Sequence, residues 1–306
     1  MKKIYSLLFL VLLSFSCSDA DDIISKDNPQ LRKPGRVINV LDPTKLAKVV
    51  FYPESTFEKN YYFYPNGLLR KITNANGTLF QAFMYDSNNN LIYTQRSNSS
   101  QSYTYTFTYD DNNHITTVNG DAVTYDPIAN QYIFHYAPVF YNDPECPTCY
   151  DYADRTEITL NNEMLIIDEK TFYLSSDGSY FYGGMFAGYD NGNMSYVSGA
   201  TDPSGPSYSY DNKTNPLKFA LSPICRALSV AKGLNYYDRF ATGENNSTNN
   251  VIFNGYGISD PESEEYIIEY NANNLPFRTT QKGYYFQTLE STRTFALYYY
   301  QGDPIP

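Results

Sequence analysis

Hydrophobic and polar positions alternate most strictly in the segment 102–109, where aromatic residues take every second place and Ser or Thr takes the others. A period of two is typical of a β-strand, with rings on one face and hydroxyl groups on the other. We therefore expect Tyr103, Tyr105, Phe107 and Tyr109 to lie on one face and to be mostly buried. The polar-flanked segments around it are also predicted strands: 80–85, 90–96 and 115–118. Together they predict a β-meander of linked hairpins.

A Tyr-Asp pair, followed by Asn and Gly residues and then an apolar residue, recurs along the chain. The clear copies begin at Tyr85, Tyr109, Tyr189 and Tyr210, and weaker copies begin at Tyr64, Tyr125 and Tyr270. In each copy we expect Tyr to end a strand on the buried face, and Asp or Asn to bond backbone N–H groups further on. Asn and Gly then supply the positive φ angles of a tight turn.

The copies lie about 20 residues apart, which fits one hairpin per repeat. Such a unit cannot bury its aromatic face alone, so neighbouring units are expected to pair side by side. The prediction is an all-β fold, an antiparallel meander of tandem β-hairpin repeats that forms a large twisted sheet or an open barrel. We expect it to be one domain, residues 37–306, with strands over more than half of its ordered residues.

The repeat pattern lapses at 217–250, where a helix is expected. Ser222 followed by Pro223 suits a helix N-cap with Pro at the first helical position, and Gly233 suits the helix end. One short helix is therefore predicted near 222–232.

The Tyr-Asp turns resemble the repeats of the RHS/YD family, and more narrowly the YD-repeat lipoproteins common in Bacteroidetes. The resemblance covers 60–280 and depends on a degenerate motif. Large RHS proteins build hollow β shells around a cargo toxin, but this chain is too short to enclose a cargo and has no toxin-like tail. The resemblance therefore implies the architecture of tandem β-hairpins. It also supports carbohydrate binding, which is ascribed to some YD-repeat proteins. Most of the lipoprotein group lacks a known activity.

The N-terminus has the pattern of a bacterial lipoprotein signal. Lys2 and Lys3 precede a short apolar run, 4–13, and Ser14-Phe15-Ser16 then leads to Cys17, with Phe15 a departure from the usual small residues. The run is too short for a comfortable transmembrane helix. An ordinary secretory signal with a nearby Cys is the alternative. We expect residues 1–16 to be removed and Cys17 to carry several acyl chains, which suffice for stable anchoring in a membrane.

Residues 17–36 are predicted to form an acidic flexible tether. The acidic cluster at 18–22 resembles the surface-export signal of Bacteroidetes lipoproteins, and a simple solvated tether is the alternative. The expected location is the outer membrane, with the protein lipid-anchored at the cell surface. A periplasm-facing position is the alternative.

Charge and composition narrow the classes of partner. The chain carries a net charge of −11 and has no run of Lys and Arg, and phosphate contacts need such clusters. Nucleic acid is therefore not an expected partner. The 33 Tyr and 19 Phe residues suit strands, because aromatic rings pack well across a pleated surface. The absence of Trp weakens the case for a typical sugar-binding platform, although Tyr can serve.

Cys146 and Cys149 lie in a Pro-rich lapse of the repeat, where a loop is predicted before strands at 155–160 and 164–168. The C-x-x-C spacing occurs in redox and metal motifs, but a thioredoxin-like site needs the pair to open a helix after a strand. We expect a local disulfide, because the outer compartment is oxidising. A bridge from Cys225 to either member is the alternative.

Other candidate chemistry is weaker. A zinc site at the Cys pair would need two more ligands, which only Cys225, His114 and His135 could supply, and Cys225 is instead expected to be buried in the helix. The segment 86–90 places oxygen atoms at alternate positions but lacks the rest of a calcium loop, so a turn is expected, with a loose surface calcium as the alternative. We expect no cofactor. No catalytic motif occurs, although glycoside hydrolysis by two carboxylates is left open by the sequence.

The sequence thus favours a non-catalytic surface module that binds a glycan or an extracellular polymer. A structural or protein-interaction accessory of an outer-membrane complex is the alternative. The expected partners are the membrane, through the lipid on Cys17, and a glycan or an envelope protein. Exposed Tyr rings flanked by Asn or Asp in one groove would favour glycan binding, and a broad apolar patch would favour protein binding. Paired carboxylates in a deep cleft would favour an enzyme.

Overall fold

The computed structural model describes most of the chain beyond its N-terminal segment. The described residues are 41–97, 102–135, 152–162, 165–174, 180–199, 207–232, 247–255 and 262–306. The chain divides into two units, Met1–Asn39 and Val40–Pro306, and all described residues belong to the second. Among the described residues, no helix is both long enough and apolar enough to cross a membrane.

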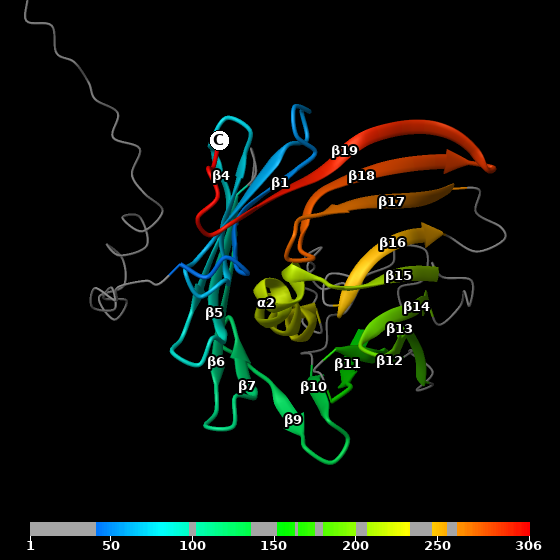
Figure 1. Ribbon diagram of the computed structural model, residues 1–306. Helices are drawn as coiled ribbons and strands as arrows, with labels where there is room; N and C mark the ends of the chain where they lie inside the picture. Colours follow the sequence, from blue (N-terminus) through cyan, green and yellow to red (C-terminus); the bar gives the residue numbers. More distant parts are fainter. Residues whose placement is uncertain are drawn as a thin grey trace, which may run out of the picture. The chain divides into compact units, whose positions relative to one another are not determined.

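The described residues form a 19-stranded antiparallel sheet and one helix, α2 (Figure 1). The strands are β1 (Leu46–Phe51), β2 (Lys59–Phe63), β3 (Leu69–Asn74), β4 (Leu79–Tyr85), β5 (Leu91–Ser97), β6 (Ser102–Tyr109), β7 (Ile115–Val118), β8 (Asp121–Ala122), β9 (Thr124–Asp126), β10 (Gln131–His135), β11 (Tyr152–Leu160), β12 (Ile166–Leu174), β13 (Tyr180–Asp190), β14 (Asn193–Gly199), β15 (Ser207–Thr214), β16 (Asn249–Gly255), β17 (Glu262–Tyr270), β18 (Pro276–Tyr285) and β19 (Thr288–Tyr300). Strands adjacent in sequence pair along the meander, and β1 pairs with both β2 and β19. Within the described residues, the strands do not close into a barrel. The predicted fold class, an all-β antiparallel meander, is confirmed.

The turns after Tyr85, Tyr109 and Tyr270 have the geometry that the repeat predicts, whereas the turn predicted at Tyr210 is wrong, because β15 continues through Asp211 to Thr214 and pairs with β16 there. Asp110 Oδ1 accepts hydrogen bonds from the backbone N–H groups two and four residues later, at 2.9 and 2.8 Å. Asn113 then takes a φ of 65°. The turns that begin at Asp86 and Asn271 repeat the same two hydrogen bonds. The side-chain oxygen thus satisfies N–H groups that the hairpin ladder leaves open, which confirms the local chemistry expected of the repeat.

In three copies the Tyr hydroxyl group connects the repeat to the one before it. The hydroxyls of Tyr85, Tyr109 and Tyr210 donate to the backbone oxygens of Leu69, Leu91 and Met194, at 2.8, 2.7 and 2.7 Å. Burial raises the pKa of Tyr109 well above its usual value, so its hydroxyl stays protonated and donates. The repeated Tyr therefore contributes a buried ring and a specific hydrogen bond between neighbouring hairpins.

The register of β6 is the predicted one, with one exception. Tyr105 and Phe107 are buried, Tyr109 is half-buried, and the alternating Thr residues are exposed. Tyr103, which was also expected to be buried, is 43% exposed. It lies opposite Arg96 near the end of the β5–β6 hairpin, beyond the part of the sheet that the core covers.

The helix α2, Pro216–Lys232, begins six residues before the predicted start at Ser222. Asn215 is its N-cap, because its Oδ1 accepts a hydrogen bond from the N–H of Leu217 at 3.0 Å. Pro216 takes the first helical position, where a missing N–H does no harm. Pro223 therefore lies inside the helix. It removes one interior hydrogen bond but does not end the helix.

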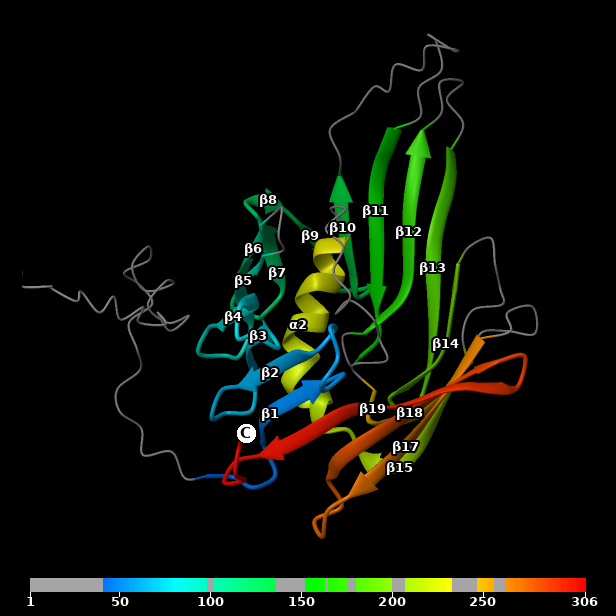
Figure 2. The ribbon, with the colours of Figure 1, turned by 90° about the horizontal axis from the view of Figure 1, so that it is seen from above.

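One face of α2 packs into the hydrophobic core on the inner side of the curved sheet (Figure 2). Ile224 and Leu228 are fully buried there, in the same cluster as Tyr132. Arg226 donates a hydrogen bond to Asn90 Oδ1 in a repeat turn, at 2.5 Å. The predicted helix end at Gly233 lies outside the described residues.

The two strands predicted after the Pro-rich loop are present but longer than expected. The segment 155–160 is the second part of β11, whereas 164–168 overlaps only the start of β12, which runs on to Leu174. The length of a strand in a sheet depends on the strand it pairs with, and β12 pairs with β13 as far as Leu174.

Candidate functional site

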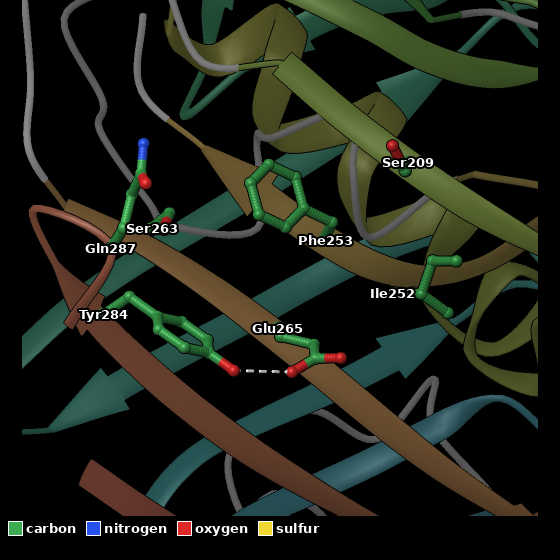
Figure 3. Close-up of a pocket in the computed structure, with 7 residues that line it drawn as sticks. All are labelled: Ser209, Ile252, Phe253, Ser263, Glu265, Tyr284 and Gln287. Carbon is green, nitrogen blue, oxygen red and sulfur yellow. Dashed lines mark hydrogen bonds between the residues drawn. The ribbon is translucent and has the colours of Figure 1, made fainter. Parts of the chain in front are cut away.

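An open hollow of about 670 Å³ lies on the sheet where β15, β16, β17 and β18 run side by side (Figure 3). Its described lining residues are Ser209, Ile252, Phe253, Ser263, Glu265, Tyr284 and Gln287. Gln287 belongs to the turn after β18, and the other residues come from the four strands. The lining combines apolar groups with a few hydrogen-bonding groups, which is typical of ligand sites.

The register explains why these residues gather. Ser209 lies opposite Phe253, and Phe253 lies opposite Glu265. Ser263 lies opposite Tyr284. Residues directly opposite each other share a face of a sheet, as do residues two apart on one strand. These five side chains therefore project from one face, which we call the outer face because the alternate residues of the neighbouring strands enter the core on the other side.

A β-bulge brings a sixth residue into the hollow. Ser209 pairs with Phe253, but the next residue, Tyr210, pairs with Val251, so Ile252 is extra. A bulged residue loses its place in the strict alternation of faces. Ile252 can therefore line the same hollow as Phe253, its neighbour in the chain.

Two exposed rings on the outer face each cover a glycine. A Cβ on Gly255 would lie 2.6 Å from Phe253 Cε1, and a Cβ on Gly188 would lie 2.1 Å from Tyr196 Cε1. Phe253 is still 36% exposed and Tyr196 is 49% exposed. Glycine thus lets each ring lie against the backbone while much of its surface stays accessible.

Glu265 is the charged group of the hollow. Its Oε2 accepts hydrogen bonds from the Tyr284 hydroxyl at 2.8 Å and from Lys282 Nζ at 3.3 Å. The bond from Tyr284 lowers the pKa of Glu265, and the bond from Lys282 lowers it further. The same carboxylate raises the pKa of Tyr284. At neutral pH the hollow therefore presents a carboxylate held by a protonated phenol.

The neighbouring carboxylate, Glu264, points to the opposite face and forms a separate polar cluster. Its two oxygens accept hydrogen bonds from Gln281 at 2.6 Å and from Tyr266 at 2.5 Å. Arg293 donates to Gln281 Oε1 at 2.7 Å. These groups satisfy one another. Of the described residues that line the hollow, only Glu265 is acidic, so this described lining holds one carboxylate rather than the pair that glycoside hydrolysis needs.

The residues singled out from the sequence lie away from this hollow or outside the described part. Cys17, Cys146 and Cys149 fall outside the described residues, so the lipidation and the local disulfide stay predictions. Cys225 is buried on α2, as expected. The rival bridge from Cys225 to the Cys pair is likewise untested.

The two histidines and the calcium-like segment have structural surroundings. His114 Nδ1 lies 3.1 Å from Asp110 Oδ2, and the His114 ring stacks on Tyr125 with centroids 3.9 Å apart. His114 thus has a carboxylate partner within its own turn and a stacked ring from β9. His135 is exposed at the end of β10. Both carboxylate oxygens of Asp86 accept hydrogen bonds within its own turn, in agreement with the turn interpretation. The described residues contain no group of three or more potential metal-ligating His, Cys, Asp or Glu side chains.

The sequence patterns do not predict this hollow. Its residues span from Ser209 to Gln287 and meet only through the pairing of four strands. Nothing local separates Phe253 from the many buried rings. The weak signal present is Gly255, two residues after Phe253, which leaves room for a ring to lie over the strand.

Comparison with known proteins gives distant structural likeness. No protein-family model matches the chain, and no curated protein matches it. A porin-like protein from Bacteroides uniformis is similar over 86% of this chain and 99% of that chain, at 10% identity and a TM-score of 0.38. A porin-like protein from Bacteroides vulgatus is similar over 84% of this chain and 99% of that chain, at 11% identity and a TM-score of 0.30. The crystal structure of TcdB2-TccC3-TEV is similar over 91% of this chain and 15% of that chain, at 12% identity and a TM-score of 0.24.

Proposed function

We propose that this protein is a cell-envelope lipoprotein that binds a glycan, without catalysis, through the outer-face hollow. The observation that supports it best is Phe253, an accessible ring in a hollow that also holds Glu265, Tyr284 and two Ser residues. A sugar ring has apolar C–H faces that stack on aromatic rings, and hydroxyl edges that need donors and acceptors. The hollow offers both kinds of contact side by side.

The chemistry of the hollow favours an uncharged glycan. Glu265 already pairs with Lys282, so the site has no unbalanced positive charge to attract an acidic sugar. The net charge of −11 opposes the approach of a polyanion. Tyr196, exposed on the same face of β14, offers a second ring to a ligand longer than the hollow.

The binding test is an array of neutral and acidic oligosaccharides of increasing length, probed with the full chain in mild detergent. We expect binding to neutral oligosaccharides that strengthens with length and is insensitive to salt. Binding confined to acidic sugars, or no binding to any glycan, would contradict the proposal.

The membrane location is proposed from the sequence pattern at 1–22. Cys17 would carry the lipid, and the acidic cluster at 18–22 would favour the cell surface. Mass spectrometry of the native protein tests the first point, because an unmodified N-terminus anywhere other than Cys17 contradicts it. Protease accessibility in intact cells tests the second. We also infer membership of the YD-repeat lipoproteins, supported by the Asp-capped turns and the Tyr hydrogen bonds between repeats.

A protein-interaction accessory of an outer-membrane complex is the second candidate. The observation that favours it is the group of exposed apolar side chains at the β18–β19 tip, Tyr285, Phe286 and Leu289. This role predicts that cross-linking in intact cells captures one envelope protein through the tip, with no dependence on added glycan. Loss of the cross-link when a glycan is added would favour the binding module instead.

A further inference from the structure

The turn between β18 and β19 has an uncommon backbone. Tyr285 pairs with Thr288 across a two-residue connection, and the two residues between them, Phe286 and Gln287, have φ angles of 44° and 64°. Positive φ at both central positions is the type I′ turn, which matches the twist of a hairpin. A bulky residue such as Phe rarely takes positive φ, because its Cβ crowds the backbone.

Elsewhere the same chain builds such turns from the preferred residues. Asn119–Gly120, between β7 and β8, has φ angles of 53° and 90°, and Asn191–Gly192, between β13 and β14, has 51° and 76°. Asn-Gly is the pair that type I′ turns favour most. Phe-Gln in the β18–β19 turn is therefore a departure within one molecule, and strain of this kind persists at sites where it serves a function.

Burial of the turn does not explain the departure. Phe286 is 68% exposed, and its ring contacts the Tyr285 ring edge-on, with the centroids 4.7 Å apart. Gln287, in contrast, lines the hollow together with Tyr284, the residue at which β18 approaches the turn (Figure 3). The strained turn thus places the Gln287 amide in the lining of the hollow, whereas the exposed Phe286 ring lies against Tyr285.

We propose that the β18–β19 turn is a binding element, in which Gln287 determines specificity. This inference rests on the proposed function and refines it. The Gln287 amide offers both donors and an acceptor, which suits the vicinal hydroxyl groups of a neutral sugar.

The test replaces Phe286-Gln287 by Asn-Gly, the pair that this chain uses in its other two-residue turns. A double variant, Phe286→Asn with Gln287→Gly, should relieve the backbone strain, and Gly120→Gln is the matched control, which introduces strain in a turn outside the hollow. Thermal unfolding and affinity for the array oligosaccharide that the unmodified chain binds best are measured for all three proteins. Phe253→Ala is measured in parallel as the variant of the hollow itself.

We expect the double variant to melt about 2–4 °C higher and to bind about tenfold more weakly, the effect of losing the hydrogen-bonding side chain of Gln287. Gly120→Gln should melt lower and bind normally. An unchanged or lower melting temperature of the double variant contradicts the stored strain, and higher stability with unchanged affinity contradicts the binding role. If Phe253→Ala loses binding while the double variant does not, the proposed function stands and this inference fails. If the unmodified chain binds no glycan, both fail.

Discussion

The hydroxyl of Tyr109 donates a hydrogen bond to the backbone oxygen of Leu91, 2.7 Å away and 18 residues earlier in the chain. Leu91 is the apolar residue that begins the return strand of the preceding repeat, so this bond joins one hairpin to the next. Tyr109→Phe keeps the buried ring and leaves the Leu91 carbonyl without this donor. We expect a loss of about 1 kcal/mol in the free energy of unfolding, measured by urea denaturation.

The matched control is Tyr103→Phe on the same strand, where the ring is exposed. Surface substitutions usually change stability by less than about 0.5 kcal/mol. If the two variants are equally stable, the hydroxyl bond does not hold the repeats together.

The start of α2 can be tested by comparing its two candidate caps. Asn215→Ala removes the oxygen that accepts the Leu217 N–H, and should cost about 1 kcal/mol of stability. Ser222 lies inside the helix, so Ser222→Ala should be nearly neutral. Helix content by circular dichroism and unfolding in urea distinguish the two. A larger loss of stability in Ser222→Ala than in Asn215→Ala would indicate that the helix begins at Ser222.

Acid stability should depend on the capping carboxylates of the repeat turns. The hydrogen bond from the His114 backbone N–H lowers the pKa of Asp110. The folded state therefore binds this proton less readily than the unfolded chain does. The resulting stability is present above the ordinary Asp value of about 3.9 and is lost as the pH falls through the lower folded value.

Asp110→Asn removes this titration while keeping a cap, because Asn271 accepts the same two hydrogen bonds in its own turn. We expect the variant to lose less of its melting temperature than the unmodified chain as the pH falls from about 5 to 3. Asp111→Asn changes the net charge equally without altering the capping carboxylate, and should retain the full acid sensitivity. Parallel curves for the unmodified chain and Asp110→Asn would contradict the assignment.

The repeats could be predicted because their chemistry is local. Asp110 bonds N–H groups within four residues of itself, and the alternation of 102–109 assigns faces without knowledge of the partner strands. The burial of a residue, in contrast, depends on what packs against its strand. Tyr103 and Tyr105 have the same place in the alternating pattern, but Tyr105 is buried in the core and Tyr103 is exposed.

The helix start and the hollow were missed for two physical reasons. Asn215 and Pro216 belong to the Tyr210 copy of the repeat, where a turn is expected. In the structure, Asn215 instead caps α2 and Pro216 is the first residue of the helix. Phe253 and Tyr284 are far apart in sequence and meet through the register of β16, β17 and β18. Sequence patterns give the face of a residue within one strand, but not its neighbours across the sheet.

The most direct test of glycan binding by the outer-face hollow is calorimetric titration of Phe253→Ala beside Phe277→Ala, with the best array oligosaccharide. The two rings are similarly exposed, 36% and 42%, but only Phe253 lines the hollow. We predict that Phe253→Ala weakens binding about tenfold or more, whereas Phe277→Ala binds like the unmodified chain. Equal affinity of all three proteins, or an equal loss in both variants, would contradict a binding site in this hollow.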